Sequence, residues 1–527
     1  MNGNIYKVLI ILVCFAFVLV VALTVPQKDT QETGRLEEQS TILVPKEEVS
    51  KVEPAEEIVL EHNPELRILI TTSDFRGSIH EEVRVTSSRD FRIKGEDGTL
   101  FAEYGAWEEI DLDIFQMQPG ECLIFESDEK ISLPSVKRAQ GVPEYYGTLQ
   151  IYKEDEGYSI INVVPMEQYL LSVVPSEMPS TYPMEALKAQ AVCARSYAYH
   201  YVVNLPELPH GAHMNDSTDY QVYNNIEETE NTNTAIAETE GMILVKEGLP
   251  IPTYFFSTSC GYTTNETIWK KYFNGTEPED GEIPTVVFDI GTTEAKEDVN
   301  FPSVPVIGNS AIETLQMDDK TFVYSAEELA GEDKFSDYIT KIDENSLEMQ
   351  EQWYRWTYTG IITRELIEKK LQERYAVRPD LILTQTEEGY FTNQEIETIG
   401  DIIGIEIMKR LDGGVADELI LETTKDTYLV IGEYNIRYVL SDEKSEVTRN
   451  DGSKVTVPYL LPSAYFIMEP ISSANGVVKK ITLTGGGYGH GVGMSQNGAK
   501  CAADIGMKCE EILELFYTEL QIMTISA

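Results

Sequence analysis

An apolar run near the N-terminus most constrains what this chain of 527 residues can fold into. The run Val8–Val25 contains 18 residues without a charge, and Lys7 precedes it. A helix of that length rises about 27 Å, close to the thickness of the hydrocarbon core of a bilayer. We therefore expect residues 1–25 to form a short cytoplasmic start and a retained transmembrane anchor, with the rest of the chain outside the cytoplasm. A cleaved signal peptide and a buried core helix are the alternatives, and residues 22–24 match a cleavage site poorly.

The charge of the chain argues against nucleic acid as a partner. The sequence has 41 Lys and Arg against 89 Asp and Glu, which gives a net charge of −48. Nucleic-acid binding needs clustered Lys and Arg that contact phosphates, so we expect no nucleic-acid partner. A polyanionic partner of any other kind would have to meet a local cationic patch. Apolar residues make up 42% of the chain, which is enough to build hydrophobic cores.

The pattern beyond the anchor predicts an α+β fold with several short β-sheets and a few long helices. Residues 26–64 are charged and lack aromatic side chains, which is typical of an acidic disordered tether. Short runs rich in β-branched residues predict a β-rich N-terminal lobe over 65–165. The alanine-rich stretch Met184–Val203 predicts a long helix, because Pro183 suits a first helical turn. Strand-like segments return further along the chain, and the strongly acidic stretch 276–350 is interpreted as a surface insertion.

Glu177 is the first candidate for a catalytic residue. It stands among apolar residues and between Pro175 and Pro179, which restrict the backbone on both sides. An apolar setting disfavours the charged form of a carboxyl group and raises its pKa, so that the group can serve as a general acid near neutral pH. The alternative is an inert carboxylate near the N-terminus of the following helix. Arg195 lies in that helix, and its guanidinium would either pair with a carboxylate or bind a substrate oxygen.

A glycine-rich segment supplies the second group of candidates. Residues 484–500 read TGGGYGHGVGMSQNGAK, which matches neither GxGxxG nor GxxxxGKS/T, so a phosphate-binding loop is excluded. Other groups can approach the backbone of such a segment closely, and His490 and Gln496 are among its few polar side chains. His490 is interpreted either as a structural histidine or as a functional one.

Three histidines between residues 200 and 213 raise the question of a zinc site. His200, His210 and His213 are accompanied by Asp216 and Asp219, and no cysteine lies nearby. Structural zinc sites rely on thiolate and imidazole ligands. We therefore expect no metal, and no cofactor is expected elsewhere in the chain.

Three long segments carry a recognisable family pattern. They read INVVPMEQYLLSVVPSEMPSTYPMEALKAQAVCARSYA (161–198), TYFFSTSCGYTTNETIW (253–269) and GGGYGHGVGMSQNGAKCAADIGMKCEEILELFYT (485–518). In this order they resemble the stage II sporulation protein D family, also called the SpoIID/LytB or amidase-enhancer domain. The resemblance implies a SpoIID-like catalytic or glycan-binding core over 140–275 and 350–527. It also implies a single-pass extracytoplasmic protein that acts on the glycan strands of peptidoglycan.

The resemblance also implies roles for single residues. Glu177 matches the family's catalytic glutamate, and Arg195 matches its glycan-binding arginine. His490, Ser495 and Gln496 fall in the GHGVGMSQ signature that lines the same site, which implies substrate binding. The His and Cys metal cluster that many sporulation members carry ahead of QVY has no thiolates here, where the run reads NDSTDY.

The residues are compatible with glycan cleavage by a single carboxyl group. A hydrolysing glycosidase ordinarily uses two carboxyl groups at a fixed separation. A lytic transglycosylase can use one, because the muramic acid's own 6-hydroxyl attacks the anomeric carbon. Glu177 would protonate the glycosidic oxygen and then accept the proton of that hydroxyl. The sequence thus predicts a lytic transglycosylase that cleaves peptide-stripped glycan strands. The alternatives are a glycan-binding scaffold or activator of a cell-wall amidase, and a true muramidase.

Overall fold

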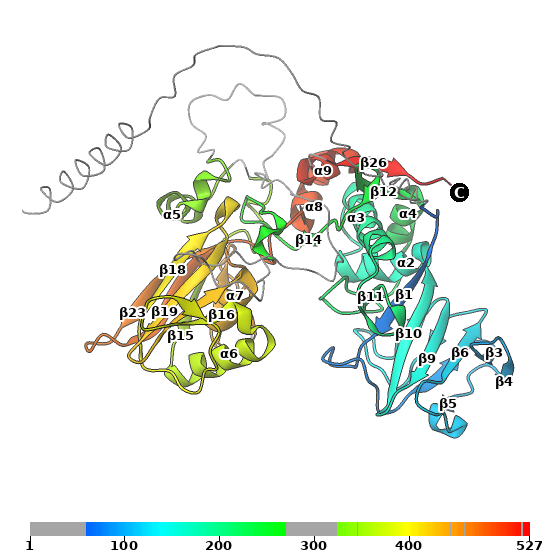
Figure 1. Ribbon diagram of the computed structural model, residues 1–527. Helices are drawn as coiled ribbons and strands as arrows, with labels where there is room; N and C mark the ends of the chain where they lie inside the picture. The colour runs from blue at the N-terminus through cyan, green and yellow to red at the C-terminus, as the bar shows by residue number, and fades with distance from the viewer. Residues whose placement is uncertain are drawn as a thin grey trace, which may run out of the picture. The chain divides into compact units, whose positions relative to one another are not determined.

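The structure is a computed structural model that describes residues 60–269 and 324–526, apart from residues 345, 443, 458, 518 and 519. Within these residues the chain forms eight α-helices and six β-sheets (Figure 1), which confirms the predicted α+β class. The predicted anchor over 1–25 and most of the predicted tether over 26–64 lie outside the described residues. In the described part of the chain, none of the helices is long and apolar enough to span a membrane.

The N-terminal strands form a seven-stranded sheet and a four-stranded sheet. The large sheet has the order β11-β1-β10-β9-β6-β3-β4 and consists of β1 (Glu65–Ile70), β3 (Phe91–Gly95), β4 (Leu100–Tyr104), β6 (Cys122–Ser127), β9 (Thr148–Lys153), β10 (Tyr158–Pro165) and β11 (Met214–Asn215). The small sheet has the order β5-β2-β7-β8 and consists of β2 (Arg84–Ser87), β5 (Ile110–Asp111), β7 (Ile131–Ser132) and β8 (Glu144–Tyr145). Along β3, Phe91 and Ile93 are buried and Arg92 is exposed, because successive side chains of a strand point to opposite faces.

Three helices pack together beside the large sheet: α2 (Met166–Glu177), α3 (Met184–Val203) and α4 (Glu230–Glu238). Helix α3 has the bounds that the sequence predicts. It contributes to two hydrophobic cores, because Ala194 and Ala198 lie in the core of the N-terminal sheet and Ala189 and Val192 lie in the core of the C-terminal half. Small side chains let neighbouring elements come close to the helix axis.

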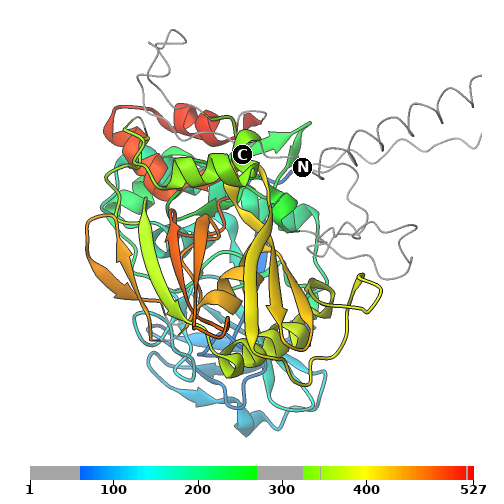
Figure 2. The same ribbon diagram turned by 90° about the vertical axis from the view of Figure 1, so that its left-hand side faces the viewer.

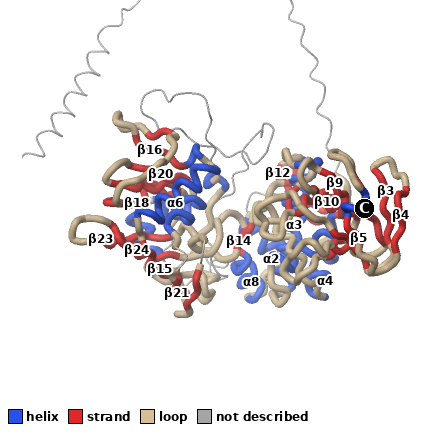
Figure 3. Tube along the Cα trace, turned by 90° about the horizontal axis from the view of Figure 1, so that it is seen from below, coloured by secondary structure: helices blue, strands red, loops and turns tan. Residues whose placement is uncertain are grey.

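Two five-stranded sheets make up most of the C-terminal half. The first has the order β22-β21-β15-β24-β23 and consists of β15 (Trp356–Ile361), β21 (Glu446–Arg449), β22 (Lys454–Thr456), β23 (Phe466–Ser472) and β24 (Val478–Gly485). The second has the order β17-β16-β20-β19-β18 and consists of β16 (Ile382–Gln385), β17 (Phe391–Thr392), β18 (Ile402–Arg410), β19 (Ala416–Thr423) and β20 (Thr427–Ile431). They meet where β18 contacts β23 and β24 (Figure 2). Helix α6 (Arg364–Val377) packs against the second sheet (Figure 3). Helix α7 (Glu433–Leu440) contacts β19 and β20 of the same sheet.

Short strands join segments that are far apart in the sequence. Strand β14 (Phe255–Phe256) runs parallel to β25 (Met494–Ser495). Strand β12 (Met242–Lys246) pairs with β13 (Leu249–Pro250) on one side and with β26 (Gln521–Thr524) on the other. Helices α8 (Gln496–Asp504) and α9 (Cys509–Phe516) follow β25 and contact α3. The glycine-rich segment is thereby placed beside α3.

The described end of the predicted insertion over 276–350 packs into the core. It contains η5 (Glu328–Ala330) and α5 (Glu332–Ile339), and the side chains of Phe335 and Tyr338 are buried. The hydroxyl of Tyr338 donates a hydrogen bond of 2.7 Å to the backbone oxygen of Cys260. Residues 324–350 therefore support the 253–269 segment. The part of the predicted insertion before residue 324 lies outside the described residues.

The other short 3-10 helices are η1 (Leu112–Phe115), η2 (Pro209–Gly211), η3 (Glu266–Ile268), η6 (Pro379–Leu381) and η7 (Asp412–Gly414).

Candidate active site

Glu177 is the last residue of helix α2. The helix ends there because Met178 has an extended backbone (φ −131°) and precedes Pro179, which disfavours the helical conformation in the residue before it. Glu177 thus ends one helix and precedes the next, α3, which begins at Met184. At the C-terminal end of a helix the dipole disfavours a carboxylate instead of stabilising it.

The carboxyl group of Glu177 is half-buried and held by one backbone donor. The N–H of Val222 donates a hydrogen bond of 2.6 Å to Oε1 of Glu177. Burial raises the pKa of Glu177 to about 7, although the hydrogen bond from Val222 acts in the opposite direction. Oε2 has no hydrogen-bond partner within the described residues. A carboxyl group with such a pKa can donate and accept a proton at neutral pH.

Gln496, the first residue of α8, lies directly against Glu177. Its Nε2 atom donates a hydrogen bond of 3.0 Å to the backbone oxygen of Glu177 and contacts Oε1 of Gln190 on α3 at 3.3 Å. The structure thus brings the glycine-rich segment and the Glu177 segment into one site. In this conformation Gln496 positions the backbone that carries the acid.

Ser495 is fully buried and caps helix α8. Its hydroxyl accepts a hydrogen bond of 3.1 Å from the N–H of Gly498 and donates one of 2.6 Å to Oε1 of Glu348. Glu348 is itself fully buried and also accepts hydrogen bonds from the backbone N–H and the hydroxyl of Ser259. Burial raises the pKa of Glu348 to about 7 against the effect of these donors. Ser495 therefore fixes the start of α8 and is not exposed to a substrate.

Sequence reasoning missed Glu348. The residue falls in the stretch that is interpreted as a surface insertion, where one glutamate among many gives no signal. Its role depends on Ser259 and Ser495, which are distant in the sequence from it and from each other.

His490 uses both ring nitrogens within the protein. Nε2 lies 3.0 Å from the backbone oxygen of Phe255, and Nδ1 accepts a hydrogen bond of 3.1 Å from the N–H of Val492. Burial lowers the pKa of His490 to about 4, so the ring is neutral at pH 7. The ring of Trp269 lies 5.2 Å away. This geometry favours the structural interpretation of His490.

Arg195 is fully buried and does not reach Glu177. Its Nε and Nη2 atoms donate hydrogen bonds of 2.7 and 2.8 Å to the two carboxylate oxygens of Glu167, at the start of α2. The same guanidinium donates to the backbone oxygens of Met242 and Ile236. Of the two sequence interpretations, the geometry fits pairing with a carboxylate, because a side chain with no exposed surface cannot contact a glycan in this conformation.

Three further polar side chains lie near Glu177, and sequence reasoning missed them. The hydroxyl of Tyr169, Nε2 of Gln190 and Oε1 of Gln221 are buried and have no hydrogen-bond partner within the described residues. Tyr169 interacts electrostatically with Glu177, and Gln221 precedes Val222. Buried polar atoms of this kind cost free energy unless water or a ligand satisfies them. One of the three could have been found from the sequence, because Gln190 is a polar residue in an alanine-rich helix.

Three of the five candidate zinc ligands have other partners. Asp216 is fully buried, forms an ion pair with Arg138 and accepts hydrogen bonds from the N–H and hydroxyl of Thr71. His213 accepts a hydrogen bond of 3.1 Å from the N–H of Arg67, and His210 lies 2.7 Å from a carboxylate oxygen of Glu154. The described residues contain no group of three His, Cys, Asp or Glu side chains suited to a metal.

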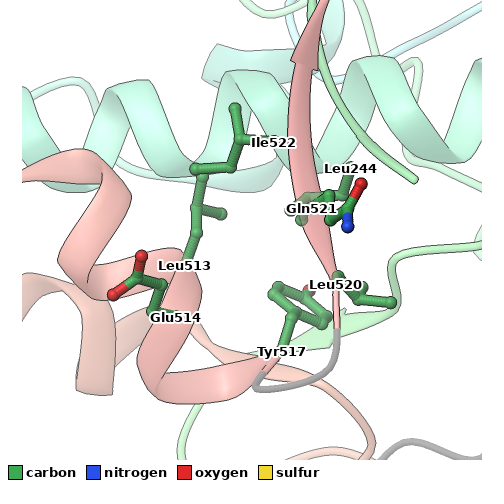
Figure 4. Close-up of a pocket in the computed structure, with 7 residues that line it drawn as sticks. All are labelled: Leu244, Leu513, Glu514, Tyr517, Leu520, Gln521 and Ile522. Atoms are coloured by element: carbon green, nitrogen blue, oxygen red, sulfur yellow. The ribbon is translucent and has the colours of Figure 1, made fainter. Parts of the chain in front are cut away.

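A separate cavity of about 360 Å³ lies between α9, β26 and β12 (Figure 4). It is lined by Leu244, Leu513, Glu514, Tyr517, Leu520, Gln521 and Ile522. None of the sequence-predicted site residues lines it.

The fold and the site define a class: an α+β protein in which a glycine-rich segment holds the backbone of a glutamate with a raised pKa. The profile of the family described as stage II sporulation protein, SpoIID, matches residues 154–245, which include Glu177 and Arg195. Together with the relatives below, this match shows that the chain belongs to the SpoIID family.

The relatives carry two kinds of name. The chain is 30% identical over 232 residues to stage II sporulation protein D of Bacillus amyloliquefaciens, covering 38% of this chain and 67% of that protein. It is 31% identical over 223 residues to stage II sporulation protein D of Bacillus subtilis, covering 38% and 64%. It is 25% identical over 351 residues to the amidase enhancer of Bacillus subtilis, covering 66% and 39%. The chain thus spans between 37% and 67% of the length of the curated relatives it matches.

Arg195→Ala should destabilise the fold, by about 3–5 kcal/mol, because the carboxylate of Glu167 would be left without its cation. Urea unfolding of the full-length protein measures the loss, and Arg195→Met combined with Glu167→Gln should recover much of it. A variant with unchanged stability but weaker glycan binding would contradict the structural role and support the substrate-binding one.

Zinc should be present at well under one equivalent in the purified protein, because the partners of Asp216 leave its carboxylate no free coordination site. Elemental analysis measures the content, and a chelator should leave the melting temperature unchanged. A stoichiometric zinc whose removal lowers the melting temperature would show that residues of the 210–219 stretch rearrange to bind it.

Proposed function

We propose that this protein is a membrane-anchored, extracytoplasmic lytic transglycosylase that cleaves peptide-stripped glycan strands of peptidoglycan. The observation that carries the proposal is the state of Glu177, a half-buried carboxyl group whose pKa is raised to about 7 by burial and whose Oε2 has no partner within the described residues. The substrate class is the one that the resemblance to the SpoIID family implies, and membership of that family supports it.

Glu177 acts first as an acid and then as a base. Oε1 accepts from the N–H of Val222, so the proton is carried by Oε2. Oε2 gives this proton to the glycosidic oxygen as the bond from that oxygen to the anomeric carbon breaks. The 6-hydroxyl of the same muramyl residue then attacks the anomeric carbon, and Oε2 takes its proton. The product strand ends in a 1,6-anhydro ring, and no water is consumed.

Glu348 is not available as the second carboxyl group of a hydrolytic pair in this conformation. Among the described carboxyl groups, Glu348 is the other one whose pKa is raised to about 7 by burial. Its two oxygens accept hydrogen bonds from Ser259 and Ser495, and its side chain has no exposed surface. Activation of a water molecule by Glu348 would require these contacts to break. Glu348 therefore does not supply the second carboxyl group that a muramidase would need.

A second candidate function is activation of a cell-wall amidase, in which the site binds glycan without cleaving it. The observation that favours it is the similarity to a relative named amidase enhancer, which extends over 66% of this chain. Cleavage by the purified protein distinguishes the two functions.

Glu177→Gln should lower the rate of cleavage of peptide-stripped glycans by about 10²–10⁴-fold, because the amide cannot donate the proton. Glycan binding should persist, since the amide has nearly the same size and its oxygen can still accept from the N–H of Val222. Glu388→Gln, at an exposed position, is the matched control and should leave the rate unchanged. Mass spectrometry should find 1,6-anhydromuramic ends in the wild-type products.

The rate of the wild-type protein should fall as the pH rises through about 7, because the raised pKa of Glu177 keeps the acid protonated only below that value.

A reducing sugar at the new end would contradict transglycosylation. Full activity of Glu177→Gln would remove Glu177 from the mechanism. Stimulation of an added amidase without cleavage would support the second candidate.

The full-length protein should remain in the membrane fraction after a high-salt or carbonate wash, because the predicted anchor over 1–25 is held by apolar contacts rather than by charge. Fractionation followed by immunoblotting measures this. A soluble mature form that begins near residue 25 would show that the segment is a cleaved signal peptide.

A further inference from the structure

An aromatic pair at the glycine-rich segment has no part in the mechanism above. Tyr488 lies within the segment and has 38% of its surface exposed. Its ring centroid is 4.7 Å from that of Trp353, which is half-buried. The guanidinium of Arg449, at the end of β21, lies 5.3 Å from the centre of the Trp353 ring. An exposed aromatic ring that stacks on a second ring, with a planar cation over that second ring, has the chemistry that binds a sugar, since the exposed ring packs on the C–H face and the cation donates to oxygens.

The backbone holds these rings in fixed positions. The N–H of Gly487 donates a hydrogen bond of 2.8 Å to the backbone oxygen of Trp353. Tyr488 exchanges two backbone hydrogen bonds with Thr258, of 2.7 and 3.1 Å. Gly487 has φ +81°, a conformation that side-chain-bearing residues rarely adopt. A rigid aromatic surface loses little conformational entropy when a ligand binds.

A row of contacts connects the pair to Glu177. The hydroxyl oxygen of Thr258 accepts a hydrogen bond of 2.8 Å from the side-chain amide of Asn497. The same amide accepts one of 2.5 Å from the hydroxyl of Tyr182, five residues after Glu177. Asn497 also follows Gln496, which holds the backbone of Glu177. These hydrogen bonds connect the backbone of Tyr488 to the segments on either side of the proposed acid.

We propose that Tyr488, supported by Trp353 and Arg449, forms a subsite for a pyranose ring of the glycan strand at a distance from the bond that is cleaved. The subsite rests on the proposed function for its ligand. It binds the strand equally in the ground state and in the transition state, so it lowers KM and leaves kcat unchanged. The ring of Tyr488 supplies the contact face, and Arg449 supplies N–H donors to sugar oxygens.

The test measures binding separately from cleavage. Chito-oligosaccharides of increasing length are titrated into full-length Glu177→Gln protein, and the change in tryptophan fluorescence reports binding. Tyr488→Ala in this background should weaken binding of the long oligosaccharides about tenfold, which is the effect of losing one aromatic contact. Tyr488→Phe should restore it, because the ring and not the hydroxyl makes the contact. Trp353→Ala removes the tryptophan at the subsite, so its binding is measured by calorimetry, and it should be weaker in the same direction.

Matched controls separate the subsite from exposed aromatic residues in general. Tyr390→Ala and Trp107→Ala remove side chains that are 54% and 69% exposed and should leave binding unchanged. In otherwise wild-type protein, Tyr488→Ala should raise KM with kcat unchanged.

The outcomes distinguish the subsite from the proposed function. Equal binding by Tyr488→Ala and its parent overturns the subsite, even where the wild-type protein cleaves glycans. Tyr488-dependent binding without cleavage by the wild-type protein supports the subsite and refutes the transglycosylase. Loss of binding in both Tyr488→Ala and Tyr488→Phe overturns the role of the ring, and a lower melting temperature in both would attribute that loss to the fold.

Discussion

The burial of helix α3 in two hydrophobic cores is the constraint on which the remaining structure depends. Its alanines pack against the N-terminal sheet on one side and against the C-terminal half on the other. Partners stabilise the charged and amide side chains of this buried helix, since Glu167 pairs with Arg195 and Nε2 of Gln496 donates to Oε1 of Gln190. These contacts fix the orientation of α2, which carries Glu167, and of α8, which begins at Gln496, against α3. The geometry around Glu177 follows from this arrangement.

Two opposing effects set the pKa of Glu177. Burial favours the protonated form, and the N–H of Val222 favours the ionised form. A fully buried carboxyl group such as that of Glu348 already accepts hydrogen bonds from several protein donors, so its oxygens are not available to a substrate. A fully exposed one would ionise near its usual pKa. A general acid and base requires the intermediate case, with one oxygen held and one oxygen available.

The sequence alone predicts part of this arrangement and not the rest. The bounds of α3 follow from its alanine content and from Pro183, and the raised pKa of Glu177 follows from its apolar neighbours. Helix α2 was not predicted, because Pro175 within its last turn reads as a break. The partners of Arg195 and Glu348 come from distant segments, and no local pattern specifies them. For Arg195 the alternative of pairing with a carboxylate was open, and only the tertiary structure identifies Glu167 as that carboxylate.

The strands that close the fold determine the order in which it can be assembled. Phe255 pairs with Met494, and Met242 pairs with Thr524, so each contact closes a loop of more than two hundred residues. Contacts of such high sequence separation form slowly, because chain entropy is lost before they add stability. A chain emerging from the ribosome presents Glu177 long before Gln496 exists to hold its backbone. The acid therefore gains its complete surroundings only after the C-terminal segments have been synthesised and packed, which makes its competence a late event in folding.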